Sequence, residues 1–177
     1  MGLENLKPGV AVPQDINVVI EIPSNAPPVK YEVDKETGLV SVDRFLGTAM
    51  FYPCEYGFIP HTLSEDGDPV DVLLISPYPL HSGCIIRARP VGMLLMTDES
   101  GKDTKILCVP IDKLTKRYQH VHKPEDLGSD TLNTIEHFFK HYKDLEPGKW
   151  AKIEGWQDEK SAAQEILAGI ERYKKTA

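Results

Sequence analysis

The chain has 177 residues, a net charge of −7 at pH 7, and 27% charged residues. This length allows a real hydrophobic core, and the acidic balance argues against a general nucleic-acid binder. No apolar run approaches the roughly 18 residues of a membrane-spanning helix, and residues 1–13 carry no secretion signal. Three cysteines without a C-x-x-C pair (Cys54, Cys84 and Cys108) favour free thiols in a reducing cytoplasm.

The first half of the chain predicts short strands separated by turns. We expect strands over residues 16–22, 29–33 and 39–45 and, after an aromatic and proline-rich connector at 51–60, over 70–75. Glu21 interrupts the apolar residues of the first strand. In the second strand Lys30 and Glu32 share one face, because side chains two residues apart point the same way. The third strand carries Arg44.

The second half predicts further strands and then two helices. We expect strands over 85–95, 105–109 and 150–156, and helices from Ser129 or Asp130 to Pro147-Gly148 and from 159 to 174. The strand at 85–95 is expected to bend at Pro90 and Gly92, and residues 110–128 to be irregular or briefly helical. No linker or repeat interrupts the pattern. It indicates one domain over 1–177, a mainly β fold with a small closed antiparallel barrel and flanking helices.

The most informative stretch is Asp66-Gly67-Asp68-Pro69-Val70-Asp71, which leads into an apolar strand. Three carboxylates in one tight turn repel each other, so bulk water or a hard divalent cation must offset that repulsion. A calcium-binding EF-hand loop fits poorly because Asp71 stands where that loop requires glycine. A phosphoaspartyl enzyme also fits poorly, since Leu63-Ser64-Glu65 rather than an apolar strand precedes the acids. A solvated acidic turn remains the simplest alternative.

A second acidic turn, at 97–103, contains Asp98 and Asp103 and is followed directly by Lys105. More charged residues lie where strands meet turns or inside apolar strands. The acids are Glu21, Glu32, Asp66, Asp68, Asp71, Asp98 and Asp103, and the bases are Lys30, Arg44, Lys105 and Lys143. If these seven acids and four bases converge in one site, their excess negative charge can be buried only together with metal ions. Lysine and arginine among metal-binding carboxylates are typical of a site for a phosphate polyanion carried with its cations.

These residues stand in segments that resemble the family I soluble inorganic pyrophosphatases of the prokaryotic type. The segments are 26–32, Phe51-Tyr52-Pro53, 56–60, D-G-D-P-V-D-V at 66–72, 92–105, 137–143 and Gly148-Lys149-Trp150. The resemblance implies an OB-like five-stranded closed β-barrel with two C-terminal helices. It also implies a cytoplasmic hydrolase that splits pyrophosphate with several Mg²⁺ ions per site. By the same resemblance the protein is a homohexamer, with His137 and His141 at a subunit contact.

The resemblance also implies a role for each site residue. Asp68 is the expected general base. Asp66, Asp71 and Asp103 are the expected principal metal ligands, with Asp98 and Glu21 as further metal-side carboxylates. The expected phosphate-binding groups are Lys30, Arg44, Tyr56, Lys105, Tyr142 and Lys143, and Glu32 and Tyr52 are expected to support the site.

The chemistry agrees with this assignment. Two divalent cations can lower the pKa of a shared water, and Asp68 can take its proton before direct attack on phosphorus. Three alternatives remain: a non-catalytic OB-type binding module, a divalent-cation buffer, and a nucleotide pyrophosphohydrolase. The low isoelectric point disfavours a binding module, and the four lysine and arginine side chains, which repel cations, disfavour a cation buffer. A nucleotide pyrophosphohydrolase would need a pocket for the nucleobase, and none is recognisable in the sequence. A metal site at His137 and His141 lacks the glutamate of an H-E-x-x-H motif.

Overall fold

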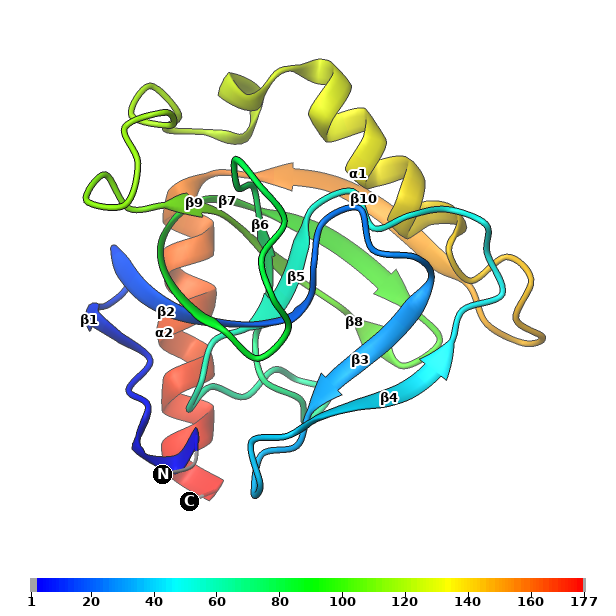
Figure 1. Cartoon of the computed structure of the whole chain (residues 1–177), viewed down its shortest axis with the longest axis horizontal. Coiled ribbons are helices and arrows are strands. Elements are labelled where there is room, and N and C mark those ends of the chain that lie inside the picture. Colours follow the sequence, from blue (N-terminus) through cyan, green and yellow to red (C-terminus); the bar gives the residue numbers. More distant parts are fainter. Residues whose placement is uncertain (1–2, 177) are drawn as a thin grey trace.

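The computed structural model describes residues 3–176, so the ends of the expected domain (Met1, Gly2 and Ala177) lie outside the described residues. Within that range five strands close into a ring, because β2 pairs with β5 on one edge and with β7 on the other (Figure 1). In order around the ring these are β2 (Asp15–Ile22), β5 (Glu55–Phe58), β6 (Asp71–Leu74), β9 (Lys105–Pro110) and β7 (Ile85–Asp98). The predicted five-stranded, OB-like arrangement is confirmed.

The expectation that this ring is wholly antiparallel was wrong, because β6 and β9 run parallel. The long strand β7 separates these two strands in the sequence and lies on the far side of β9, so the chain returns in its original direction. Parallel register places Asp71 directly beside Lys105 at the start of both strands. The two acidic turns therefore open at the same end of the ring.

The segment 51–60, interpreted from the sequence as a connector, contains a strand of the ring. Strand β5 has only four residues, and prolines flank it at positions 53 and 60, so its sequence shows no alternating pattern. Gly57 permits its pairing: a Cβ atom at this position would lie 2.0 Å from the Val19 carbonyl oxygen on β2. Only glycine allows so close an approach of two backbones.

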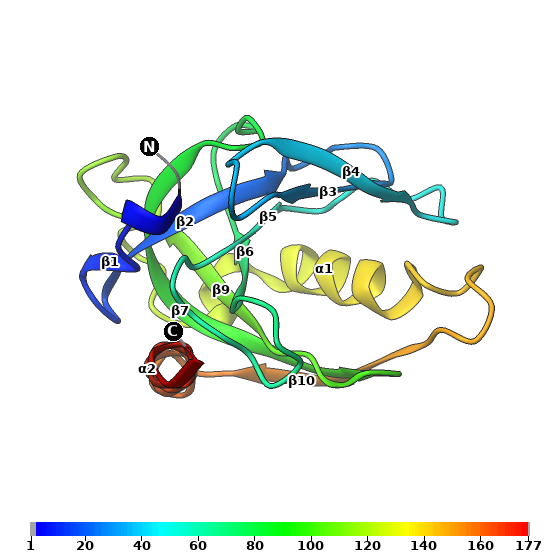
Figure 2. The same ribbon diagram turned by 90° about the horizontal axis from the view of Figure 1, so that it is seen from below.

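The remaining strands extend or flank the ring. They are β1 (Gly9–Ala11) beside β2, β8 (Gly101–Lys102) and β10 (Ala151–Gln157) beside β7, and the separate hairpin of β3 (Val29–Val33) and β4 (Val40–Phe45). The sequence did not predict β1 or β8. Figure 2 shows the β3–β4 hairpin and β10 on opposite sides of the molecule. The hairpin makes no sheet pairing with the ring within the described residues.

Two helices pack on the ring: α1 (Ser129–His141) and α2 (Glu159–Thr176). Helix α1 begins at Ser129, one of the two expected starts, but neither Ser129 nor Asp130 caps it: Gly128 occupies the N-cap position with a φ of 85°. This helix also ends at His141, well before Pro147, which leaves an irregular loop at 142–150. Short 3₁₀ turns occur at Leu3–Asn5 and Pro124–Leu127. None of the described helices is long and apolar enough to cross a membrane.

The two helices hold opposite faces of β6 in the core. Val72 packs in the same buried cluster as Ile166 of α2, whereas Leu73 packs in the cluster that contains Phe138 of α1. Each fully buried side chain of this size contributes about 1.5–3 kcal/mol of transfer free energy. The strand that carries Asp71 is therefore rigidly placed.

Candidate active site

A cavity of about 340 Å³ lies where the acidic turns, the β3–β4 hairpin and the end of α1 meet. Every site residue that the sequence analysis named lines it: Glu21, Lys30, Glu32, Arg44, Tyr52, Tyr56, Asp66, Asp68, Asp71, Asp98, Asp103, Lys105, Tyr142 and Lys143. These residues come from segments more than 100 positions apart. The fold thus brings the predicted set together.

The turn at 66–71 forms one rim of this cavity. Gly67 adopts a φ of 96°, and the Asp68 amide donates a hydrogen bond of 3.0 Å to Oδ1 of Asp66. The Asp68 side chain remains 78% exposed, with Lys35 Nζ 3.7 Å from its Oδ1 atom. Burial raises the pKa of the Asp66 carboxyl group. Asp68 is therefore a solvent-accessible carboxylate at the rim of the cavity.

Lys105 forms the buried centre of the site. Its Nζ atom donates hydrogen bonds to Oδ2 of Asp71 at 2.7 Å and to Oδ1 of Asp103 at 2.8 Å. The Tyr56 hydroxyl group donates to the same Asp71 oxygen at 2.6 Å. Burial alone would lower the pKa of Lys105, but the charges of Asp103 and Asp71 outweigh it and hold that pKa well above its usual value. Lys105 is a permanent cation here.

The Asp71 carboxyl group is less well compensated. Burial raises its pKa, the Lys105 charge opposes this effect, and the nearby Asp103 charge adds to it. Glu21 faces a similar environment: burial, against a hydrogen bond from the Val33 amide, raises its pKa to about 7. Additional positive charge in the cavity would stabilise the ionised form of both carboxyl groups.

A second lysine, Lys143, pairs with the acids of the other turn. Its Nζ atom lies 2.6 Å from Oδ2 of Asp98 and 3.1 Å from Oε1 of Glu99, and its side chain is 6% exposed. Burial would raise the pKa of Asp98, but the hydrogen bond from Lys143 outweighs it and lowers that pKa. Asp98 therefore stays ionised at neutral pH.

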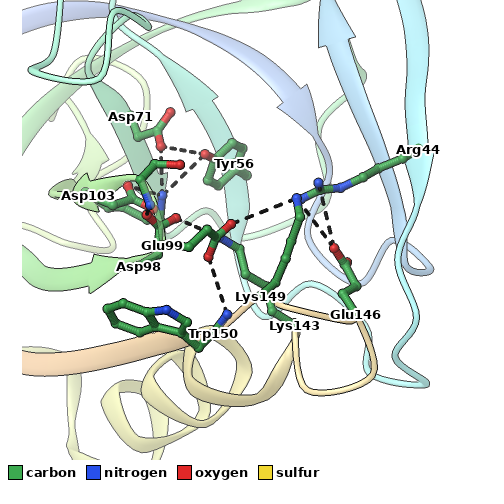
Figure 3. A network of polar contacts seen from close by, with 12 residues as sticks. Arg44, Tyr56, Asp71, Asp98, Glu99, Asp103, Lys143, Glu146, Lys149 and Trp150 are labelled. Atoms are coloured by element: carbon green, nitrogen blue, oxygen red, sulfur yellow. Dashed lines mark hydrogen bonds and ion pairs between the residues drawn. The ribbon is translucent and has the colours of Figure 1, made fainter.

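The outer end of the cavity is more exposed and mostly basic. Lys30 Nζ lies 2.6 Å from Oε1 of Glu32 and 3.3 Å from Oδ2 of Asp43. Arg44, beside Lys30 on the hairpin, faces Lys149 from the loop at 142–150 (Figure 3). Such a group of cations is suited to binding a phosphate anion.

Three tyrosines form the apolar backing of the site. The Tyr52 ring packs against Phe138 at a centroid distance of 4.8 Å and against Tyr56 at 6.3 Å. The Tyr142 ring stacks on Phe138 at 5.6 Å. Burial raises the pKa of all three hydroxyl groups, so they remain neutral hydrogen-bond donors.

The donor set fits hard divalent cations, although the carboxylates are not arranged around one point. Among residues 3–176 no three carboxylate, histidine or cysteine side chains are grouped closely enough to hold one ion. Asp71 and Asp103 instead face Lys105. Carboxylate oxygens are nevertheless the ligands that Mg²⁺ prefers, and a cation nearby would favour the ionised form of Glu21 and Asp71, whose pKa values burial raises.

Sequence reasoning gave no role to some residues that line the cavity, namely Lys35, Glu99, Ser100 and Lys149. Glu99 follows Asp98 directly, and Lys149 lies in the Gly148-Lys149-Trp150 segment that carried the resemblance. Their positions in those segments were therefore the available signal. Nothing in the local pattern marks Lys35, which lies in an exposed hairpin turn.

A small closed barrel whose acids and lysines converge in one cavity defines the class of protein. Carboxylates for divalent cations beside cations for a polyanion are typical of metal-dependent enzymes that act on phosphate compounds. The neutral tyrosines and the buried Lys105 add fixed donors.

Comparison with known proteins identifies the family. The family model described as inorganic pyrophosphatase matches residues 18–174. The chain is 59% identical to the inorganic pyrophosphatase of Yersinia pestis over 175 residues, which cover 99% of this chain and 100% of that protein. It is 58% identical to that of Escherichia coli (strain K12) over 174 residues, covering 98% and 99%. The chain belongs to the inorganic pyrophosphatase family, and to its prokaryotic family I type.

Solved structures agree with this assignment. An inorganic pyrophosphatase from Coxiella burnetii superposes with a TM-score of 0.91 at 48% identity, covering 95% of this chain and 99% of that one. The inorganic pyrophosphatase from Thermus thermophilus gives a TM-score of 0.92 at 44% identity, covering 98% and 99%. The whole described fold is therefore that of these proteins.

Proposed function

We propose that the chain hydrolyses inorganic pyrophosphate to two orthophosphates by direct attack of water, with no covalent phosphoenzyme. The observation that carries the proposal is the convergence of all the sequence-predicted acids and cations in one cavity. Relatives of nearly the same length that are 58–59% identical bear the name inorganic pyrophosphatase. A pyrophosphate anion is small, highly charged and devoid of apolar surface, which suits a cavity of this size and composition.

Asp68 is the general base of the proposed reaction. Its carboxylate is exposed on the rim, and its backbone amide donates a hydrogen bond to the Asp66 side chain. It can therefore accept the proton of an attacking water without first breaking a buried ion pair. General bases in such positions contribute typically 10²–10⁴-fold to the rate.

The metal ligands in this proposal are Asp66, Asp71 and Asp103, with Asp98 and Glu21 as further carboxylates toward several Mg²⁺ ions. When bound, such ions would lower the pKa of water and neutralise the charge of the phosphates. The chain's own contribution is a set of oxygen donors on rigid strands and turns. Lys105 bridges Asp71 and Asp103 with hydrogen bonds of 2.7 and 2.8 Å, and so fixes where both carboxylates lie in the cavity.

The two phosphate halves would bind to the cations and hydroxyl groups of the cavity. We assign this role to Lys30, Arg44, Tyr56, Lys105, Tyr142 and Lys143, with Glu32 and Tyr52 in support. Lys105 and Lys143 supply buried charge. Fixed charges and neutral donors in a cavity stabilise the negative charge that develops on a leaving phosphate.

The test is phosphate release from pyrophosphate by the purified protein, with Mg²⁺ and with EDTA. The expected result is fast release that requires Mg²⁺ and falls at least about 10²-fold in Asp68→Asn. Glu171→Gln, which removes an exposed charge on α2, is the control and should behave as wild type. ATP in place of pyrophosphate tests the nucleotide alternative. No release from pyrophosphate with any divalent cation would overturn the proposed function.

The assembly and location belong to the same proposal. We propose a cytoplasmic homohexamer with the face of α1 around His137 and His141 at a subunit contact. These two rings lie 4.8 Å apart, and His141 Nδ1 lies 2.8 Å from Oδ2 of Asp144. All three cysteines are free, as a reducing compartment requires. A stable monomer or dimer by sedimentation at pH 7.5 would contradict the hexamer.

A further inference from the structure

Glu146 lies behind the outer end of the cavity, between two cations that line it. Its Oε2 atom is 3.8 Å from Nη1 of Arg44 and 3.7 Å from Nζ of Lys149 (Figure 3). The Glu146 side chain is only 16% exposed and does not line the cavity itself. One carboxylate oxygen thus contacts both cations from the side away from the substrate space.

The two cations come from different walls of the cavity. Arg44 is on β4 of the hairpin, which has no sheet pairing with the ring among the described residues, and Lys149 is on the loop that follows α1. The walls also meet where Gly47 packs on Leu145, because a Cβ atom at Gly47 would lie 3.3 Å from the Leu145 Cβ atom. Glu146 is therefore part of a small contact that joins the hairpin to this loop.

Neither cation donates a hydrogen bond to Glu146 at these distances. The two ion pairs of Glu146 are 3.7–3.8 Å long, which exceeds the length of a hydrogen bond. By contrast, Lys105 donates hydrogen bonds of 2.7 and 2.8 Å to Asp71 and Asp103, and Lys143 donates one of 2.6 Å to Asp98. In the part of the chain that the structure describes, the buried Arg44 Nε atom has no hydrogen-bond partner, and neither has the Glu146 Oε1 atom. Charge attraction, not hydrogen bonding, thus holds this group together.

We propose that Glu146 is a positioning residue that holds Arg44 and Lys149 together, so that both bind one phosphate group of the substrate. Without its charge the two cations repel each other and the hairpin moves more freely relative to the loop. This inference rests on the proposed function, because it assigns a role in binding the substrate of the same site.

The sign of the effect separates this proposal from simple charge repulsion. If Glu146 only added negative charge near a phosphate site, its removal would tighten substrate binding and lower KM. If it positions two cations, its removal raises KM even though the site becomes more positive. The kcat value should change little, since an interaction that binds substrate and transition state equally affects KM alone.

The experiment is the pyrophosphate assay with Mg²⁺ on Glu146→Gln, which keeps the shape and removes the charge. We expect KM to rise about 3- to 10-fold, as for the loss of two partly exposed ion pairs, with kcat within about threefold of wild type. Glu146→Asp, whose carboxylate is set back by one methylene group, should raise KM less. Glu171→Gln, which breaks an exposed pair with Lys174 on α2, is the matched control and should leave KM unchanged.

A second step distinguishes positioning from general damage to the fold. In a Lys149→Ala background Glu146 has lost one of its two cations, so Glu146→Gln should raise KM by much less than in the wild type. A KM that stays constant or falls in Glu146→Gln overturns the inference, as does a full-size increase in the Lys149→Ala background. If Glu146→Gln fails to fold, Glu146→Asp decides by the same criteria. Absence of pyrophosphate hydrolysis by the wild type would instead refute the proposed function.

Discussion

Lys105 and Asp71 lie side by side on two parallel strands, and the Lys105 Nζ atom is 2.7 Å from Oδ2 of Asp71. They are 34 positions apart in the sequence, on β9 and β6. The lysine side chain is 3% exposed, and its charge faces two carboxylates and the Tyr56 ring. It is thus a cation that the fold keeps in place before any substrate arrives.

The first prediction concerns this lysine. Lys105→Met removes a buried charge that the proposed reaction uses to stabilise phosphate, and it leaves Asp71 and Asp103 without their shared partner. We expect kcat/KM for pyrophosphate to fall about 10²- to 10³-fold, the range found when one preorganised donor is removed. Steady-state kinetics at saturating Mg²⁺ measures it.

Lys102→Met is the matched control for this prediction. Lys102 is on β8, its side chain is 45% exposed, and its nearest acids, on Glu65 and Glu165, are 3.9–4.0 Å away. It should retain wild-type kinetics. Lys105→Met activity within about threefold of wild type would contradict the assignment of Lys105 to the site.

The second prediction follows from the Glu21 pKa, which burial raises from the ordinary glutamate value of 4.5 to about 7. A raised folded-state pKa contributes stability that is present below pH 4.5 and is lost as pH rises through 7. In EDTA, Glu21→Gln should therefore stabilise the protein by less than about 1 kcal/mol at pH 5 and by much more at pH 8.5. At about 1.4 kcal/mol per pH unit, the gain reaches about 3 kcal/mol. Denaturant unfolding at both pH values measures it.

The control for the pH prediction is Glu36→Gln, an exposed glutamate in the turn of the β3–β4 hairpin. It should have the same small effect at pH 5 and pH 8.5. An equal change in stability at both pH values in Glu21→Gln would show that Glu21 does not titrate between them.

Local pattern predicted most elements, because their signals are local as well. Strand β3 alternates cleanly, and the stripe of α2 continues from Glu159 almost to its end. Strand β5 was missed because its four residues owe their conformation to a partner: Gly57 fits against the Val19 carbonyl group of β2. A close approach of two backbones in the ring produces no periodic pattern in the sequence.

The site residues were predictable as a set, but their partners were not. The sequence indicated that Asp71, Asp103 and Lys105 belong together, since charges in apolar strands need each other. It gave no sign that Lys143 pairs with Glu99, or that Glu146 contacts Arg44. Those contacts depend on where α1 ends, and the sequence placed that end too late.

The third prediction tests the metal ligands without relying on activity. A ligand that binds only the folded state stabilises it, by about 2.7 kcal/mol at 100 times its dissociation constant. Mg²⁺ should therefore raise the thermal midpoint of the wild type at pH 8. Asp71→Asn should lose at least half of that increase, because a proposed ligand loses its charge. The measurement is thermal unfolding followed with and without 10⁻² M Mg²⁺ (on the order of the concentration needed to saturate weak sites).

Glu171→Gln is again the control and should keep the whole increase. A full Mg²⁺-dependent increase in Asp71→Asn would remove Asp71 from the ligand set, while leaving the other four carboxylates to be tested in the same way.

The last prediction concerns Gly57, which lets β5 close the ring beneath Tyr56. In Gly57→Ala the new Cβ atom would lie 2.0 Å from the Val19 carbonyl oxygen, so one strand must move. Overpacking of this kind costs about 1–3 kcal/mol or more. Because Tyr56 immediately precedes Gly57 and donates a hydrogen bond to Asp71, the shift should also lower activity.

Gly38→Ala is the control. Gly38 has a φ of 71° and a Cβ atom there would have nothing within 4 Å, so the variant should lose only about 1–2 kcal/mol of backbone energy and keep its activity. Thermal unfolding and kinetics of both variants decide the question, and equal activity in the two would show that the position of β5 does not control the Tyr56 hydroxyl group.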